Sequence, residues 1–160
     1  MPWTLRADEE RAYASWGTAL LRIVLGVIFL MHGWLGLFAF GPPALAAYIA
    51  RLGYPASLSG LFAWYLIVAH LIGGALLVVG WYTRPAALVQ IPIMAAATLQ
   101  MRWWQGFFMK GIVVDQGGRT IAGGYEYDLL VLTATCALAL LGPGRLSIDE
   151  YRRPPRWMTD

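Results

Sequence analysis

Two histidines, each embedded in a long apolar segment, are the residues of this chain best suited to chemistry. His32 and His70 are each followed four residues later by a glycine, Gly36 and Gly74, on the same helical face. Imidazole exchanges protons near neutral pH and binds metals. A glycine one turn away permits close helix packing or leaves room for a flat ligand. Three interpretations stay open: structural bundle histidines, hydrogen-bond partners of a quinone ring, or axial ligands of haem or a chlorophyll-type pigment.

Four further polar groups interrupt or border the apolar segments. Ionisable groups in hydrocarbon are costly, so each is a candidate for function. Arg22 either extends to the interface or pairs with a buried acceptor such as Gln90, which we expect at a comparable depth. Glu126 and Asp128 follow Gly123-Gly124 at the start of an apolar helix, where the helix dipole favours a capping role. Glu126 is also a candidate for lining a ligand pocket.

Several other kinds of site are not expected. The single cysteine, Cys136, excludes an internal disulfide and a dithiol pair, and its apolar neighbours predict a packing role. Met94, Met101 and Met109 are too scattered for a copper site, so no firm metal site is predicted. The chain carries no nucleophile elbow, P-loop or dinucleotide-binding glycine pattern.

The composition places these residues in a membrane. The chain has 160 residues, of which 59% are hydrophobic and 13% charged. Soluble domains have roughly 45–50% apolar and about 25% charged residues. A net charge of +3 is too small to indicate a nucleic-acid partner. The lipid bilayer is therefore the expected surrounding.

Four apolar segments are long enough to form transmembrane helices, each needing about 20 residues. They predict an all-α, four-helix membrane bundle forming a single domain over residues 1–160, with helices at about 17–40, 60–82, 85–104 and 125–142. The first helix runs outward and the second inward, so His32 and His70 should lie at similar depth, roughly 12–15 Å below the outer helix ends.

The connections carry turn and cap signals. Gly41-Pro42-Pro43 ends the first helix, and the segment after it predicts a short interfacial helix between the first and second transmembrane helices. Residues 105–124 form the longest connection. Ser147 with Glu150 predicts a capping box for a brief turn near the C-terminus.

The Lys and Arg residues predict that both termini are cytoplasmic, because the richer side of a membrane protein faces the cytoplasm. The side with the termini carries Arg6, Arg11, Arg84, Arg145, Arg152, Arg153 and Arg156, and the opposite side carries Arg51, Arg102, Lys110 and Arg119.

Three stretches resemble the DoxX family of small four-helix membrane proteins. They are LLRIVLGVIFLMHGW (20–34), HLIGGALLVVGWYTRPAAL (70–88) and GGYEYDLLVLTATCALALLGPGRLSID (123–149). The resemblance implies multi-pass insertion in a bacterial or archaeal cytoplasmic membrane and a redox-linked role at the quinone pool, because relatives are associated with thiosulfate:quinone oxidoreductase and oxidative-stress complexes. Many relatives have Lys where this chain has Gly36 and Glu where it has His70, so their charge relay is not expected to carry over.

Three hypotheses follow for the function. The first is a small subunit or partner of a quinone-linked redox complex that is not an enzyme on its own. The second is a non-catalytic accessory subunit of a respiratory or photosynthetic assembly, or a self-associating protein. The third is a tetrapyrrole carrier with His32 and His70 as ligands. The candidate ligand-site residues are His32, His70, Glu126, Gln90 and Arg22, with Gly36, Gly73 and Gly74 packing nearby.

Overall fold

The computed structural model describes residues 7–103, 106–108, 113–114, 120–121 and 124–152. Within these ranges, the regular secondary structure is helical apart from one pair of two-residue strands. Its elements are α1 (Ala7–Trp34), η1 (Leu35–Phe40), α2 (Pro42–Arg51), α3 (Ala56–Val68), η2 (Ala69–Gly73), α4 (Gly74–Val79), α5 (Thr83–Ala96), η3 (Ala97–Arg102), β1 (Val113–Val114), β2 (Thr120–Ile121), α6 (Glu126–Leu141) and α7 (Ile148–Tyr151). The η segments are π-helical turns that continue the preceding α-helices.

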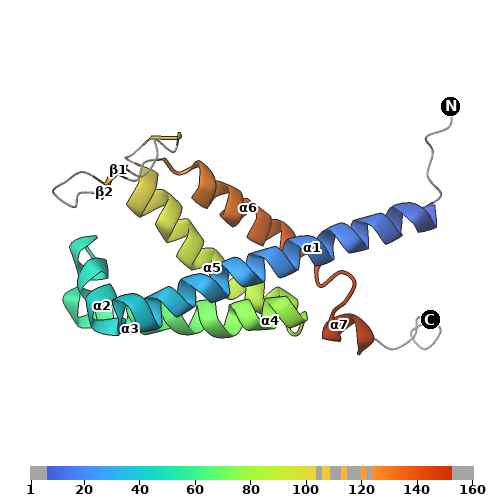
Figure 1. Ribbon diagram of the computed structural model, residues 1–160, viewed down its shortest axis with the longest axis horizontal. Coiled ribbons are helices and arrows are strands. Elements are labelled where there is room, and N and C mark those ends of the chain that lie inside the picture. The colour runs from blue at the N-terminus through green and yellow to red at the C-terminus, as the bar shows by residue number, and fades with distance from the viewer. Residues whose placement is uncertain (1–6, 104–105, 109–112, 115–119, 122–123, 153–160) are drawn as a thin grey trace.

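Each of the four predicted apolar segments forms one continuous helical run. The runs are α1–η1, α3–η2–α4, α5–η3 and α6. α1 begins ten residues before the predicted start at 17, since hydropathy marks where a helix meets lipid and not where the helix begins. The acidic residues 8–10 favour this earlier start because they complement the positive end of the helix dipole. The first turns of α1 therefore extend beyond the ends of α4 and α6 (Figure 1).

The connections largely follow the predicted turn signals. The short helix expected between the first two runs is α2, which packs against α3. The strands β1 and β2 pair antiparallel within the long connection between η3 and α6. They are the one departure, among the described residues, from the expected all-α class.

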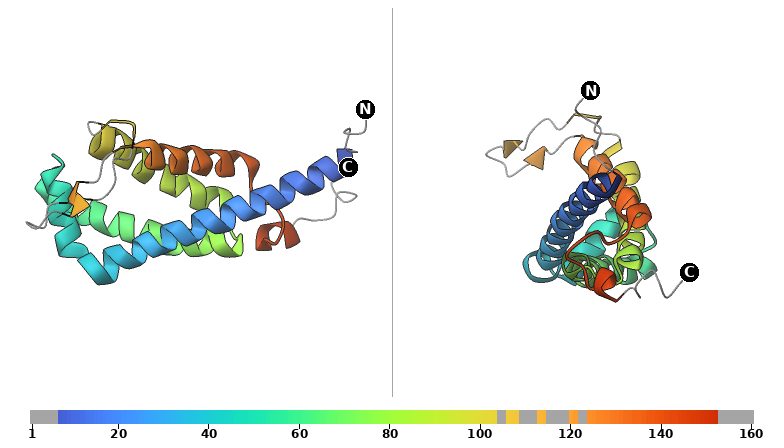
Figure 2. Two further views of the ribbon diagram at one scale, coloured as in Figure 1. Left: turned by 45° about the horizontal axis from the view of Figure 1, so that its top comes forward. Right: turned by 90° about the vertical axis from the view of Figure 1, so that its right-hand side faces the viewer.

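The helical runs pack as two pairs. α1 lies along η2 and α4, whereas α5 pairs with α6, and α6 also contacts α1 to close the bundle (Figures 1 and 2). The shared core consists of Leu25, Phe29, Leu77, Ala86, Ala87, Met94, Val131 and Leu138. Among the described residues, Glu9–Phe40 and Ala56–Val79 are helical runs long and apolar enough to cross a membrane.

Glycines bring α1 and α4 into backbone contact. A Cβ atom added at Gly74 would lie 2.6 Å from the backbone nitrogen of Leu30, and one at Gly26 would lie 2.7 Å from that of Val78. Backbone atoms cannot swing aside as a side chain does, so only glycine permits this approach. Gly74 therefore lies at the closest approach of α4 to α1.

We expect Gly74→Ala to lower the free energy of unfolding by about 1–3 kcal/mol, because the added methyl group forces the two backbones apart. Gly60→Ala is the matched control, since a Cβ there meets no atom within 4 Å, and it should be neutral or stabilising by about 0.5–1 kcal/mol through better helix propensity. Thermal or denaturant unfolding of the detergent-solubilised protein measures both. Equal stabilities of the two variants would contradict the close-contact interpretation.

Candidate functional site

His32 and His70 meet between α1 and η2. Their ring centroids are 6.4 Å apart and the rings stand edge to face at 77°. Phe29, one turn before His32, places its ring 5.2 Å from that of His70. The structure thus brings the two histidines to the same level along the bundle. His70 lies in a π-helical turn, a distortion that is frequent at functional sites.

The two imidazoles differ in burial and in hydrogen bonding. His32 is exposed, and its Nδ1 lies 2.9 Å from the Ile28 carbonyl oxygen. A carbonyl can only accept, so this Nδ1 carries the proton and, in the neutral ring, Nε2 is left as an acceptor. His70 is 5% exposed. Its Nδ1 is buried and has no hydrogen-bond partner within the described part of the chain.

Gln90 supports His70 from α5. The Gln90 side chain is fully buried, and its Nε2 donates to the carbonyl oxygen of Ala69 at 2.7 Å. This bond fixes the amide, because only its nitrogen can donate. Gly73 admits the amide, since a Cβ there would lie 2.6 Å from Nε2. Gln90 and Gly73 therefore position His70 and do not line the cavity described next.

A cavity of about 390 Å³ opens beside the two histidines. Its polar lining comes from His32, Tyr48, His70, Tyr127 and Asp128. Its other lining residues are Ile28, Phe29, Leu35, Gly36, Phe40, Leu45, Leu66, Ile93, Met94, Ala97 and Val131. A mostly apolar cavity of a few hundred Å³ with a few polar groups is typical of small-molecule sites.

The two glycines that follow the histidines have different roles. Gly74 faces the backbone of α1, whereas Gly36 lines the cavity. A Cβ at Gly36 would come no closer than 3.3 Å to a neighbour, the Cγ1 atom of Ile67. The absent Gly36 side chain therefore adds space beside the ligand cavity.

Of the two carboxylates in the first turn of α6, Asp128 lines the cavity and Glu126 does not. Their position at the helix start agrees with the predicted dipole effect, although no side chain hydrogen-bonds at the N-cap residue Tyr125. Asp128 continues the buried α6 face of Val131, Thr135 and Leu138. That spacing of three and four residues places Asp128 on one helical face with these residues, but it does not say which element this face meets.

Arg22 lies ten residues, or about 15 Å, before His32 along α1 and does not contribute to the cavity. The side chain is fully buried. Pairing with a buried acceptor is confirmed, but the acceptors are backbone carbonyls and Gln90 is not among them. Nε donates to Pro143 at 2.8 Å, Nη1 to Leu77 at 2.6 Å and Val78 at 2.8 Å, and Nη2 to Arg145 at 3.2 Å and Leu146 at 2.8 Å.

The segment bound by Arg22 is held by a second set of contacts. Asp149 accepts hydrogen bonds from the backbone nitrogens of Tyr82 at 2.9 Å and Thr83 at 2.8 Å, where α5 begins. The Ser147 hydroxyl accepts from the backbone nitrogen of Glu150 at 3.1 Å, as the capping motif predicted. Arg22 and Asp149 thus form a structural anchor at the end of the bundle away from the histidines.

Within the described residues, no cluster of three or more His, Cys, Asp or Glu side chains could hold a metal ion. Cys136 is partly buried on α6 and does not line the cavity.

Comparison with known proteins matches residues 17–103 to the family described as DoxX. These residues include every cavity position except those on α6. A Bacillus subtilis protein named "Putative oxidoreductase CatD" is 31% identical over 136 residues, which are 84% of this chain and 86% of that protein. No solved structure gives a significant match.

We expect Arg22→Gln to lower the free energy of unfolding by about 3–5 kcal/mol, since it leaves buried carbonyls without donors. Arg51→Gln, at an exposed position on α2, is the control and should change stability by less than about 0.5 kcal/mol. Unfolding in detergent measures both, and faster tryptic cleavage at Arg145 in Arg22→Gln would report release of the anchored segment. An Arg22→Gln protein as stable as Arg51→Gln would contradict the anchor.

Proposed function

The chain belongs to the DoxX family, and from this premise we propose that it is a subunit or partner of a quinone-linked redox complex. The cavity beside His32 and His70 binds the quinone ring. The observation that carries this proposal is the buried His70 imidazole at the wall of an apolar cavity, facing a second imidazole at 6.4 Å.

The chemistry of the cavity suits a quinone. A quinone is a flat apolar ring with oxygen atoms at its edge, so it needs apolar walls and a few polar contacts. Phe29 and the other apolar lining residues supply the walls, and His32 and His70 supply the polar contacts. A buried polar group without a partner costs about 1–3 kcal/mol, and a ligand oxygen that bonds the imidazole removes this cost.

The two histidines also suit proton exchange with the ring. Reduction of a quinone to a quinol takes up two electrons and two protons, and imidazole gains and loses a proton near neutral pH. Both histidines line the cavity, so each can exchange a proton with a ring bound there. We infer that a partner protein exchanges the electrons while this chain holds the ring. The name of the CatD relative, an oxidoreductase, supports a redox context.

The membrane arrangement is part of the proposal. All four helical runs cross a bacterial or archaeal cytoplasmic membrane, with both termini in the cytoplasm. Two runs have the length and apolarity for this, and the distribution of Lys and Arg residues supports the orientation.

A tetrapyrrole bound by both histidines is the second candidate, because the 6.4 Å ring separation leaves room for one metal between two imidazoles. An absorption spectrum of protein purified from its native membrane separates the two ligands. A Soret band would show that a tetrapyrrole is bound and would overturn the quinone proposal.

We expect His70→Leu and His32→Leu each to weaken binding of a tail-less naphthoquinone by about tenfold, the loss of one hydrogen bond. Calorimetric titration of the protein in lipid nanodiscs measures the dissociation constants. Thr135→Val is the control, since this buried hydroxyl bonds its own helix at Val131 and does not line the cavity. Unchanged affinity in both histidine variants would rule the proposal out.

We expect cysteines at positions 13 and 151 to react with a membrane-impermeant maleimide only after cell lysis. A cysteine at position 57, in the first turn of α3, should react in intact cells. Cys136→Ala provides the background, because Cys136 is the single native cysteine, and Tyr13, Ser57 and Tyr151 are exposed. Labelling of positions 13 and 151 in intact cells would reverse the orientation, and labelling of only one of them would refute an even number of crossings.

A further inference from the structure

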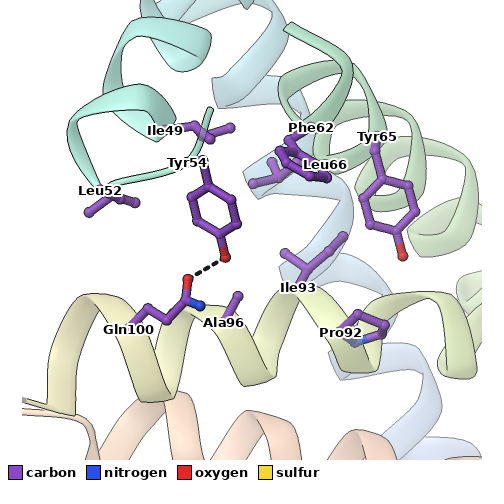
Figure 3. A pocket seen from close by; sticks show the side chains of 10 residues that line it. All are labelled: Ile49, Leu52, Tyr54, Phe62, Tyr65, Leu66, Pro92, Ile93, Ala96 and Gln100. Carbon is purple, nitrogen blue, oxygen red and sulfur yellow. Dashed lines mark hydrogen bonds between the residues drawn. The ribbon is translucent and has the colours of Figure 1, made fainter. Parts of the chain in front are cut away.

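A second cavity of about 230 Å³ lies where the α2–α3 turn meets α5 and η3 (Figure 3). Its lining residues are Ile49, Leu52, Tyr54, Phe62, Tyr65, Leu66, Pro92, Ile93, Ala96 and Gln100. Figure 3 shows Tyr54 beside Gln100 toward one end of the cavity and Tyr65 beside Pro92 toward the other. The cavity therefore extends alongside α5.

The two tyrosine hydroxyls of this cavity already have hydrogen-bond partners. The Tyr54 hydroxyl donates to Gln100 Oε1, and the Tyr65 hydroxyl donates to the Val89 carbonyl oxygen at 2.7 Å. The remaining lining side chains are apolar. The cavity therefore offers an occupant packing contacts and shape, and little hydrogen bonding.

The two cavities are neighbours. Leu66 on α3 and Ile93 on α5 line both of them. Only these side chains are shared, and rotamer changes of an aliphatic side chain are fast compared with ligand binding. A ligand whose ring lies beside His32 and His70 can thus reach the second cavity past Leu66 and Ile93.

We propose that the second cavity binds the apolar tail of the ligand whose ring occupies the histidine cavity, the ligand being a lipid-soluble quinone with an isoprenoid or alkyl chain. This inference rests on the proposed function. Two features favour such a ligand. The histidine cavity is mostly apolar and has a few polar groups for the ring, and the adjoining apolar cavity extends along α5. In lipid the tail gains no hydrophobic free energy over the bilayer, so its contribution comes from close packing against Phe62 and Ala96.

The test compares two ligands and two variants. The ligands are one naphthoquinone ring without a tail and the same ring with a decyl chain. Ala96→Phe fills the second cavity, and Ala96 does not line the histidine cavity. Ala75→Phe is the matched control, an identical substitution at an exposed position of α4 that lines neither cavity. Dissociation constants are measured by calorimetry in nanodiscs.

We expect the wild-type protein to bind the tailed ring about tenfold more tightly than the tail-less ring, because the packing contacts of the decyl tail add up. Ala96→Phe should abolish this difference and leave tail-less binding unchanged, which also shows that the variant is folded. Ala75→Phe should behave as wild type. If Ala96→Phe does not fold, the smaller Ala96→Leu should reduce the difference.

Failure of this inference is separable from failure of the proposed function. Equal affinities for the two ligands in the wild type, or a tail effect that survives in Ala96→Phe, would overturn the tail site while ring binding stays sensitive to His70→Leu. The first result is also expected if bulk-lipid acyl chains fill the cavity. If His70→Leu leaves the dissociation constant of the tail-less ring unchanged, both proposals are overturned.

Discussion

The five hydrogen bonds from the Arg22 guanidinium to backbone carbonyls fix the geometry on which the rest of the bundle depends. They join α1 to the end of α4 and to the segment that follows α6. The carbonyls in the last turn of α4 carry the partial negative charge of the helix dipole, so a cation is a favourable donor to them. With α4 fixed against α1, the glycine contacts continue along the same pair of helices. This arrangement places His70 opposite His32.

The polar groups that hold the bundle together thus lie at one end, and the polar groups of the candidate ligand site lie at the other. At one end, Arg22 and Asp149 bond to backbone groups and hold chain segments together. At the other end, His70 has a buried nitrogen without a partner in the described structure, next to a cavity. Gln90 connects these roles, because its hydrogen bond to Ala69 holds the backbone that carries His70. These polar side chains therefore serve as an anchor, a support or part of the cavity wall.

The sequence was sufficient to predict the helical runs and to predict that the two histidines lie at the same level along the bundle. Both follow from the lengths of the apolar segments and a rise of about 1.5 Å per residue. It did not show that Asp128, and not Glu126, faces the cavity, because that depends on how α6 is rotated in the bundle. The hydrogen-bond acceptors of Arg22 could not be predicted from the sequence either, since every residue has a backbone carbonyl and none leaves a sequence signal. The start of α1 was misplaced because hydropathy identifies lipid contact and not helix termini.

The Arg22 contacts also have a consequence for biosynthesis. Two of its carbonyl partners are on α4, about 55 positions later in the chain, but the other three lie 121–124 residues after it. While the ribosome is still making the last helix, the guanidinium lacks most of its final partners, and its long side chain can reach the membrane surface in the meantime. The burial of Arg22 is therefore one of the last events of assembly. A chain that ends before residue 143 would lack three of the five acceptors of this guanidinium.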